Sequence, residues 1–330
     1  MQPLILFQSL RTLVPMLVSL CCGLLLMALA ASFPARAQQV TAGVAPTPEK
    51  DASVLVLGRI SDDPKSHYEQ LKPLLEYVVP RMAGVGIRSG RILMARDFQQ
   101  MASYMRRGRV DWVTETSGNA VLLEQRADAS SMLVTERDGA SRYHSVVFVR
   151  TDSPIHTLKD LTGHSVAFQS PYSTSAYYLP ASMLLESGQR MDLLLSPMDR
   201  PPADSVGYLF ARTELNITTW VHKRLVDAGV LSNLDWISPQ RLPPAFAADF
   251  RIIAESQDVP RALVLTRAGL DPGVEARLRE VLMEASSDPD AGEAMRLFLG
   301  TSRFLPITAD DRKALDHLGT GVARVRREVE

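Results

Sequence analysis

Cysteine is nearly absent from this chain of 330 residues: Cys21 and Cys22 both lie in an apolar stretch close to the N-terminus. Neither fits a lipid-attachment signal, which requires small residues before the cysteine, because Leu20 stands there and the apolar run continues past it. We therefore expect a mature chain without cysteine. Such a chain would have no disulfides, no thiol chemistry and no cysteine-based metal site.

An excess of positive charge is also lacking. The formal net charge is -1, aromatic residues make up 6% of the chain, and no basic stripe interleaves them. This composition argues against nucleic acid as a partner. The remaining composition is that of an ordinary globular protein. The histidines are scattered without the spacing of metal ligands, so we expect no metal and no cofactor.

Only the N-terminus carries a long hydrophobic run. Residues 13–31 are apolar, Arg11 precedes them, and the small-residue sequence Ala35-Arg36-Ala37 follows. This is the arrangement of a secretory signal peptide, so we expect residues 1–37 to be removed and a mildly acidic protein to be exported to the periplasm. The run is long enough that an uncleaved membrane anchor is the alternative.

Beyond a proline-containing stretch, residues 38–51, which we expect to be a flexible leader, strand-like and helix-like patterns alternate. Residues 53–58 and 87–95 are apolar runs of strand length. Residues 66–82 place apolar side chains on one helical face. Short connections between alternating elements are typical of an α/β protein with a mostly parallel sheet.

The same patterns predict the remaining elements and their division into lobes. The strands expected further along the chain are 110–113, 132–134, 144–150, 165–168, 215–220, 250–255 and 262–267. The expected helices are 97–108, 118–126, 176–186, 203–212, 221–229, 272–286 and 291–299. Breaks near 149–151 and 255–260 suggest that the chain crosses twice between two lobes. We expect residues 52–149 plus 256–330 in lobe 1 and residues 150–255 in lobe 2, with a hinge and an interlobe cleft.

One stretch of the second lobe has the features of an anion site. The apolar strand 165–168 leads through a proline-containing loop to Ser173-Thr174-Ser175, which we call the hydroxyl turn, and then to an expected helix. A helix start presents unpaired N–H groups and a positive dipole end, which suit a phosphate-like or carboxylate-like anion. An ordinary N-cap at Ser173 or Thr174 explains the same residues.

Several segments resemble a known family in sequence and in order: 57–60 (Leu-Gly-Arg-Ile), 108–113 (Gly-Arg-Val-Asp-Trp-Val), 138–153, 158–168 with the hydroxyl turn, and 252–256. The family comprises the periplasmic solute-binding proteins of ABC transporters for phosphonate, phosphite and phosphate-like oxyanions. The resemblance covers about residues 54–318. It implies a two-lobed type II periplasmic binding fold, no catalysis, and an ABC permease as partner.

The resemblance also implies a site. The family binds its oxyanion on the hydroxyls and N–H groups of the turn that corresponds to residues 173–175, and such neutral donors need no Arg or Lys. Glu115 favours a cationic part in the ligand, since a carboxylate repels an anion. Tyr172, in the loop, is expected to form a wall. The complete predicted set is Ser173, Thr174, Ser175, Tyr172, Thr114, Glu115, Thr116, Ile60, Ser61 and Asn216.

The leading hypothesis is a monomeric, non-enzymatic protein that delivers a small oxyanion-bearing solute to an importer. The first alternative is a ligand-sensing or accessory protein of a signalling system with the same fold, whose partner would be a membrane sensor kinase. The second alternative is a hydrolase using Ser173 with the nearby His164. The chain contains no Gly-x-Ser-x-Gly motif, which disfavours the hydrolase.

Overall fold

The computed structural model describes residues 51–330. The expected signal peptide and nearly all of the expected leader lie outside these residues. From residue 51 onward the chain belongs to a single unit. Within the described part, no helix is both long and apolar enough to span a bilayer.

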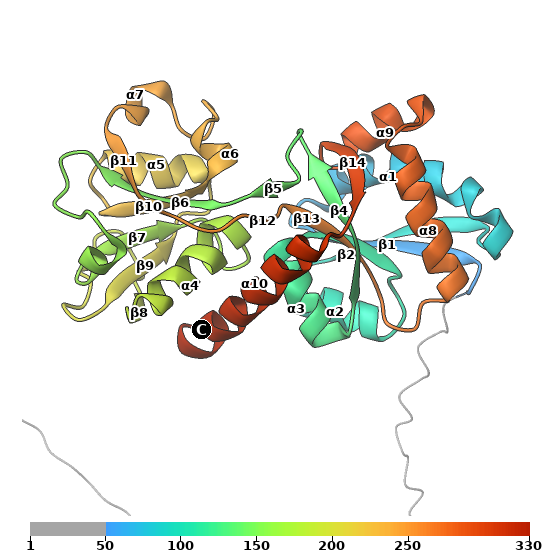
Figure 1. Cartoon of the computed structure of the whole chain (residues 1–330), viewed down its shortest axis with the longest axis horizontal. Helices are drawn as coiled ribbons and strands as arrows, with labels where there is room; N and C mark the ends of the chain where they lie inside the picture. Colours follow the sequence, from blue (N-terminus) through green and yellow to red (C-terminus); the bar gives the residue numbers. More distant parts are fainter. Residues whose placement is uncertain (1–50) are drawn as a thin grey trace, which may run out of the picture. The chain divides into compact units, whose positions relative to one another are not determined.

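The first lobe is built on a six-stranded sheet in the order β14-β4-β13-β3-β1-β2 (Figure 1, right). β1 pairs in parallel with β2 and β3, whereas β13 runs antiparallel to β3 and β4, and β14 antiparallel to β4. The strands are β1 (Val54–Ile60), β2 (Ser89–Ala95), β3 (Trp112–Thr116), β4 (Ser130–Arg137), β13 (Ala262–Thr266) and β14 (Thr301–Pro306). The helices of this lobe are α1 (Pro64–Arg81), η1 (Ala83–Val85), α2 (Phe98–Arg106), α3 (Ser117–Ala127), α8 (Pro272–Ala285), η4 (Pro289–Ala291) and α9 (Gly292–Leu297).

The second lobe has its own six-stranded sheet in the order β11-β6-β10-β7-β9-β8 (Figure 1, left). β7, β8, β9 and β10 are mutually parallel, and β6 is antiparallel to β10 and β11. The strands are β6 (Ser145–Arg150), β7 (Ser165–Phe168), β8 (Met191–Leu193), β9 (Val206–Phe210), β10 (Ala228–Ser232) and β11 (Phe250–Glu255). The helices are η2 (Leu158–Leu161), η3 (Thr174–Tyr178), α4 (Leu179–Glu186), α5 (Glu214–His222), α6 (Asn233–Trp236) and α7 (Pro244–Ala247).

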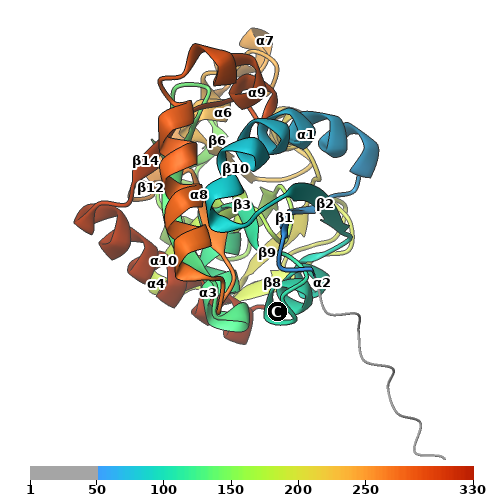
Figure 2. The same ribbon diagram turned by 90° about the vertical axis from the view of Figure 1, so that its right-hand side faces the viewer.

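Two short strands connect the lobes. β5 (Arg142–Tyr143) pairs antiparallel with β12 (Val259–Pro260). The long helix α10 (Ala309–Glu328) packs against α3 of the first lobe, α4 of the second lobe and β12 between them (Figures 1 and 2). The hinge therefore consists of a paired double connection with a helix lying along it.

The first connection lies earlier in the chain than the break expected near residues 149–151. β6 pairs with both β10 and β11, which places residues 145–150 in the second sheet. Residues 145–149, which we expected in lobe 1, are thus strand residues of the second lobe. The lobes are connected at β5, immediately before β6.

Three expected elements of the second lobe are wrong. Residues 203–212, expected to be helical, contain strand β9. Residues 215–220, expected to be a strand, lie in helix α5. Residues 221–229, expected to be helical, contain the end of α5 and the start of β10.

Local contacts explain why residues 214–222 form the helix α5 although several of them are β-branched. Thr213 caps the helix, because its hydroxyl accepts a hydrogen bond from the Asn216 N–H at 3.1 Å. Ile217 and Val221, one turn apart, are both fully buried. Tertiary packing of this apolar face outweighs a weak local preference for strand.

The core beneath the hydroxyl turn joins elements of both lobes and α10. Tyr177 and Tyr178 are fully buried in this core. Leu318 and Val322 of α10 belong to the same apolar cluster, together with Val121 of α3. The hydroxyl turn therefore rests on a rigid base.

Candidate functional site

The hydroxyl turn begins a helix, but the helix is not a regular α-helix. Ser173 is the N-cap: its hydroxyl accepts a hydrogen bond from the Ala176 N–H at 3.1 Å. The next turn is a π-helix in which the Tyr178 N–H donates to the Ser173 carbonyl at 3.0 Å. Ala176 has non-helical torsions, with φ -110° and ψ 24°. Such π turns occur frequently at functional sites.

Neighbouring strands fix the position of this turn. The Gln169 N–H, just after β7, donates to the Ala176 carbonyl at 3.1 Å. The Ser145 hydroxyl, at the start of β6, donates to the Ser175 carbonyl. Burial raises the pKa of Tyr143 in the hinge strand β5, while hydrogen bonds with Thr174 and Ser175 act in the opposite direction. The turn is thus attached both to the second sheet and to the hinge.

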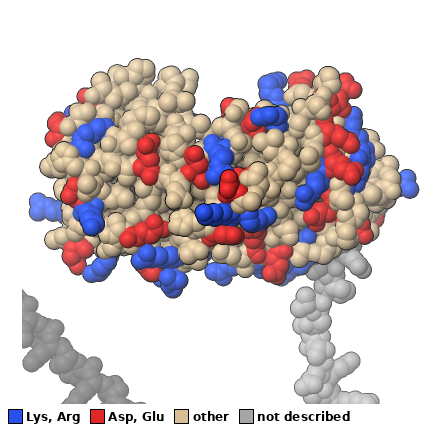
Figure 3. Space-filling view, viewed as in Figure 1, with Lys and Arg blue, Asp and Glu red and all other residues tan. Residues whose placement is uncertain are grey.

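A cavity of about 370 Å³ lies at this turn and is lined by both lobes; we call it the interlobe cavity. In Figure 3 the surface is notched between the lobes, and basic and acidic side chains both lie near the notch. The lining residues are Arg59, Ile60, Glu115, Thr116, Asn119, Arg137, Tyr143, Gln169, Ser170, Tyr172, Ser173, Thr174, Ser175, Ser232, Leu234, Asp235 and Arg261. A cavity of this size suits a small solute.

Most of the residues predicted from the sequence line this cavity. They are Ile60, Glu115, Thr116, Tyr172, Ser173, Thr174 and Ser175. The structure therefore brings the hydroxyl turn together with residues from the ends of β1 and β3.

Three predicted residues are not part of the lining. The Ser61 hydroxyl is 2.7 Å from His67 Nδ1. The Thr114 hydroxyl is buried and accepts a hydrogen bond from Arg137 Nη2 at 2.8 Å. Asn216 is exposed on α5 and donates from Nδ2 to the Ala211 carbonyl at 2.8 Å. Thr114 thus contributes indirectly, by orienting an arginine of the cavity wall.

The arginines of the interlobe cavity are the main lining residues that were not predicted from the sequence. Arg59 is the penultimate residue of β1, Arg137 ends β4, and Arg261 follows the hinge strand β12. We expected the neutral donors of the hydroxyl turn to need no Arg or Lys, whereas three arginines line the cavity. All three arginines lie at or next to the end of a strand. This position in the sequence could have identified them as candidates for the site.

Arg59 and Arg137 differ in their contacts. Arg59 Nη1 donates to the Thr114 carbonyl at 3.3 Å and lies 3.7 Å from Glu115 Oε1. Burial, followed by the proximity of Arg59, lowers the pKa of Arg137 to about 10. Arg137 therefore remains charged at neutral pH, next to a second guanidinium group.

Several buried polar atoms of this wall have no hydrogen-bond partner within residues 51–330. They are Arg59 Nε, Arg137 Nε, Glu115 Oε1 and Asn119 Oδ1. Glu115 is only 4% exposed, and its other oxygen accepts a hydrogen bond from Asn119 Nδ2 at 3.1 Å. Buried polar groups are nearly always hydrogen-bonded in folded proteins, so this wall offers both donors and acceptors to a solute.

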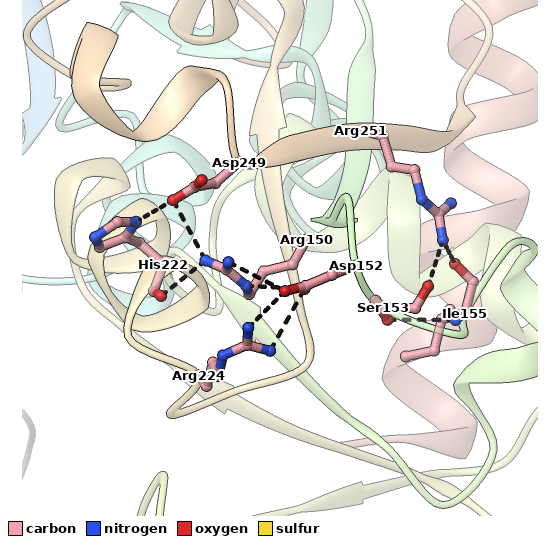
Figure 4. A network of polar contacts seen from close by, with 8 residues as sticks. All are labelled: Arg150, Asp152, Ser153, Ile155, His222, Arg224, Asp249 and Arg251. Atoms are coloured by element: carbon pink, nitrogen blue, oxygen red, sulfur yellow. Dashed lines mark hydrogen bonds and ion pairs between the residues drawn. The ribbon is translucent and has the colours of Figure 1, made fainter.

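A second charged network lies at the opposite end of the second lobe (Figure 4). Arg150 ends β6, whose other end contacts the hydroxyl turn through Ser145. Arg150 Nε lies 3.1 Å from Asp152 Oδ1, and Arg224 binds the same carboxylate. His222 Nδ1 lies 2.7 Å from Asp249 Oδ2. This network connects loops of the second lobe and is separate from the interlobe cavity.

Two α/β lobes joined by a double connection, with a polar cavity between them, define the class of periplasmic solute-binding proteins. Residues 58–312 match the family described as "ABC transporter, phosphonate, periplasmic substrate-binding protein", and the chain belongs to that family. It is therefore the solute-binding component of an ABC importer. The type II periplasmic binding fold expected from the sequence is confirmed.

Solved structures support this assignment. The protein XAC2383 from Xanthomonas citri, bound to chloride, is 56% identical over 84% of this chain and 100% of that chain, with a TM-score of 0.80. The same protein bound to ATP gives 55% identity, the same coverage and a TM-score of 0.80. PhnD1 from Prochlorococcus marinus, in complex with methylphosphonate, is 15% identical over 83% of this chain and 100% of that chain; its TM-score of 0.59 shows a shared fold.

Family membership decides between the hypotheses drawn from the sequence. Proteins of this family are periplasmic, bind a small solute and work with the membrane components of a transporter. The hypothesis of an importer component is confirmed at this level. The comparisons support neither a sensor kinase partner nor the hydrolase.

Proposed function

We propose that the interlobe cavity binds a small solute through an oxyanion group placed between the hydroxyl turn and Arg137. The observation that carries the proposal is the charge of the first-lobe wall, where Arg59 and Arg137 lie around a single carboxylate, Glu115. Removing charges from water is costly unless they are compensated. An anion in the cavity would compensate the excess positive charge of this wall.

The turn and the arginines supply donors of different kinds. The hydroxyls of residues 173–175 and the N–H groups of Thr174 and Ser175 are neutral donors at a helix start, whereas the Ser173 N–H already donates to the Ser170 carbonyl at 3.1 Å. Arg137 hydrogen-bonds to the neutral Thr114 hydroxyl, and its Nε is without a partner in the described part of the chain. Charge-assisted hydrogen bonds from guanidinium to an oxyanion are about twice as strong as neutral ones. The two sets together favour a phosphoryl or phosphonyl group.

Acceptors in the same wall indicate a second feature of the solute. Glu115 Oε1 and Asn119 Oδ1 accept no hydrogen bond from residues 51–330. Both belong to residues that line the cavity. We therefore propose that the solute carries hydroxyl or amino groups in addition to its oxyanion. The remaining proposed contacts are Ile60, Thr116, Tyr172 and Arg261.

A phosphate ester with more than one phosphoryl group is the second candidate ligand. The similar protein from Xanthomonas citri has been solved with ATP. The hydroxyl turn and the arginine pair provide two groups of anion-binding donors on facing lobes. A solute with two anionic groups would bind to the hydroxyl turn and to the arginine pair at the same time.

Calorimetry and thermal unfolding would test the proposal. The ligand panel is methylphosphonate, phosphite, inorganic phosphate, methanesulfonate, ATP and acetate, with choline and glycerol as non-anionic controls. We expect an oxyanion to bind and to raise the unfolding temperature; at a concentration 100 times its Kd the gain is about 2.7 kcal/mol. Stabilisation by choline or glycerol alone, without any oxyanion binding, would show that the proposal is wrong.

Export and assembly are separate proposals. We propose that cleavage after Ala37 releases the protein into the periplasm, since the small-residue site follows the apolar run. We also propose that the protein acts as a monomer. The intact mass of protein exported by its host and its mass by light scattering would check these points. A mass that includes residues 1–37 would indicate the membrane-anchored alternative.

A further inference from the structure

One hydrogen bond crosses directly between the lobes at the hydroxyl turn. The Gly118 N–H, in the first turn of α3, donates to Thr174 Oγ1 at 2.8 Å. Gly118 belongs to the first lobe and Thr174 begins η3 in the second lobe. Both residues are buried, and Thr174 is only 1% exposed. A residue of the predicted binding turn thus contacts the opposite lobe.

The close approach of the two lobes, rather than the backbone conformation, explains why residue 118 is a glycine. Gly118 is not among the described glycines with positive φ, so its backbone would accept an L-residue. A Cβ atom at this position would lie 2.8 Å from Thr174 Oγ1 and 2.9 Å from Tyr178 Cδ2. Real Cβ atoms almost never make contacts this short. Tyr178 is fully buried in a packed core, so we expect a larger residue to push the lobes apart rather than to displace this ring.

The same hydrogen bond orients the Thr174 hydroxyl. Because the Gly118 N–H donates to its oxygen, the hydroxyl proton points away from Gly118. Thr174 lines the interlobe cavity beside Tyr143, with which it also hydrogen-bonds, so its hydroxyl proton can go to Tyr143 or, once a solute is bound, to the oxyanion. A hydroxyl that already accepts a hydrogen bond is a stronger donor, because hydrogen bonds in a chain polarise one another.

Both partners are also attached to the hinge. Ser117, which precedes Gly118, donates from its hydroxyl to the Pro260 carbonyl of β12. Ser175, which follows Thr174, accepts on its carbonyl from the Ser145 hydroxyl next to β5. Movement of the hinge strands therefore acts on both sides of the contact.

We propose that Gly118 is a positioning residue for solute binding. Its missing side chain sets the distance at which the lobes close, and its amide directs the Thr174 hydroxyl toward the solute. The part that concerns the solute rests on the proposed function. The part that concerns lobe approach does not.

A distance measurement between the lobes tests the steric part. Spin labels are placed at E69C in α1 and L195C beyond β8 of the mature chain, whose sequence after Ala37 has no other cysteine, and distances are measured by pulsed electron paramagnetic resonance. Leu195 is 92% exposed, so a label there is tolerated. Each sample is measured without ligand and with saturating methylphosphonate or ATP. We expect the parent to show a population at shorter distance in at least one condition.

Gly118→Ala should lose this population, whereas the matched control Gly84→Ala should keep it. A Cβ at Gly84, in η1, meets nothing within 4 Å. Identical distance distributions for Gly118→Ala and the parent would overturn the inference, and so would a parent without any shorter population. If no ligand of the panel binds the parent, the proposed function fails; that result is distinct from a parent that binds while Gly118→Ala behaves identically.

Binding kinetics test the orienting part with a readout that a purely structural role would not change. With methylphosphonate, we expect Gly118→Ala to bind about tenfold more weakly, through faster dissociation with a similar association rate. If Gly118→Ala does not fold, Thr174→Val and Thr174→Ser serve instead. The valine variant should lose affinity and the serine variant should retain it. Equal affinities of both variants and the parent would overturn this part.

Discussion

At the scale of single residues, the first-lobe wall of the interlobe cavity and the hydroxyl turn differ in charge. The first lobe contributes guanidinium groups and one carboxylate, whereas the hydroxyl turn contributes neutral donors. Glu115 is held by Asn119 at 3.1 Å and lies 3.7 Å from Arg59 Nη1, so its carboxylate is part of a fixed wall. Charge substitutions in this wall should therefore change ligand affinity.

Arg137→Gln and Glu115→Gln should change affinity in opposite directions. At a mildly alkaline pH, where methylphosphonate has lost its protons but which lies below the pKa of about 10 of Arg137, Arg137→Gln should lose about 1.5–3 kcal/mol of binding free energy, the value of a charged hydrogen bond. Glu115→Gln should gain affinity, because one repulsive charge is removed. Isothermal titration calorimetry would measure both changes.

The matched control is Arg88→Gln, which removes a guanidinium group that is exposed and lies outside the cavity lining. Its affinity should equal that of the parent. A loss of affinity in both Arg137→Gln and Glu115→Gln would contradict the charge argument, since it would mean that Glu115 itself binds this anion.

Much of the site was predicted at the residue scale, with one systematic omission. The hydroxyl turn is contiguous, so a single stretch of sequence shows it. Arg59, Arg137 and Arg261 come from three strand ends that are far apart in sequence and meet only after the sheet has formed. No local pattern distinguishes them from surface arginines, and their convergence follows from the strand order.

At the scale of elements, the charged network of Figure 4 joins β6, α5 and β11 at the end of the second lobe away from the hydroxyl turn. Arg150 Nη1 donates to the His222 carbonyl at the end of α5, at 3.1 Å. Arg251 donates to the carbonyls of Ser153 and Ile155, which fixes the loop after β6. The network supplies contacts that short strands and a nine-residue helix do not make among themselves.

The network should make the stability of the folded protein depend on pH in the acidic range. Hydrogen bonds from Arg150 and then Arg224 lower the pKa of Asp152 from 3.8 to about 2. A carboxylate with a lowered pKa stabilises the fold above its unfolded value, and this stabilisation is lost as the pH falls through the folded value. We therefore expect Asp152→Asn to lower the unfolding temperature near neutral pH. We also expect the variant to lose less stability than the parent between pH 3.8 and about 2.

Thermal unfolding followed by circular dichroism across this pH range would check the expectation. Asp316→Asn, on the exposed side of α10, is the matched control and should follow the parent. If the unfolding temperatures of Asp152→Asn and the parent fall in parallel as the pH decreases, Asp152 does not carry this acid sensitivity.

Element assignment succeeded for α1 and failed for β9 and α5, and no element was predicted from the sequence for β14 or for the twenty-residue helix α10. Helix α1 places Leu71, Leu74 and Val78 on one buried face, and eighteen residues define that period clearly. β9 is a five-residue strand, and so short an apolar run fits a helix or a strand equally well. In α5, tertiary contacts that lie outside the local sequence decide the structure.

At the scale of the whole molecule, the hinge is reinforced by α10. Arg142 of β5 pairs with Asp311 in the first turn of α10 and donates to the Asp258 carbonyl at 2.9 Å. Asp311 is only 7% exposed and also accepts a hydrogen bond from the Thr308 N–H at 3.0 Å. A hinge strand and the helix beside it therefore share one carboxylate.

Arg142→Met should destabilise the protein, because it leaves a largely buried carboxylate without its cation. We expect a loss of about 1–3 kcal/mol in the free energy of unfolding, below the range for fully buried pairs because Arg142 is partly exposed. Equilibrium unfolding in urea would measure it. Lys313→Met, at an exposed position of α10, is the control. Equal stability of the two variants would argue against a role for the pair.

The order of strands in the two sheets has a consequence for how the chain folds. The second sheet is built entirely from residues 145–255, so it can form as soon as that segment is available. In the first sheet, β13 lies between β3 and β4, although residues 138–261 separate β4 from β13 in sequence. Pairings between distant segments form slowly. The discontinuous lobe must therefore wait, with the edges of β3 and β4 exposed, until the continuous lobe has been synthesised, and it is during this interval that the chain is most open to aggregation.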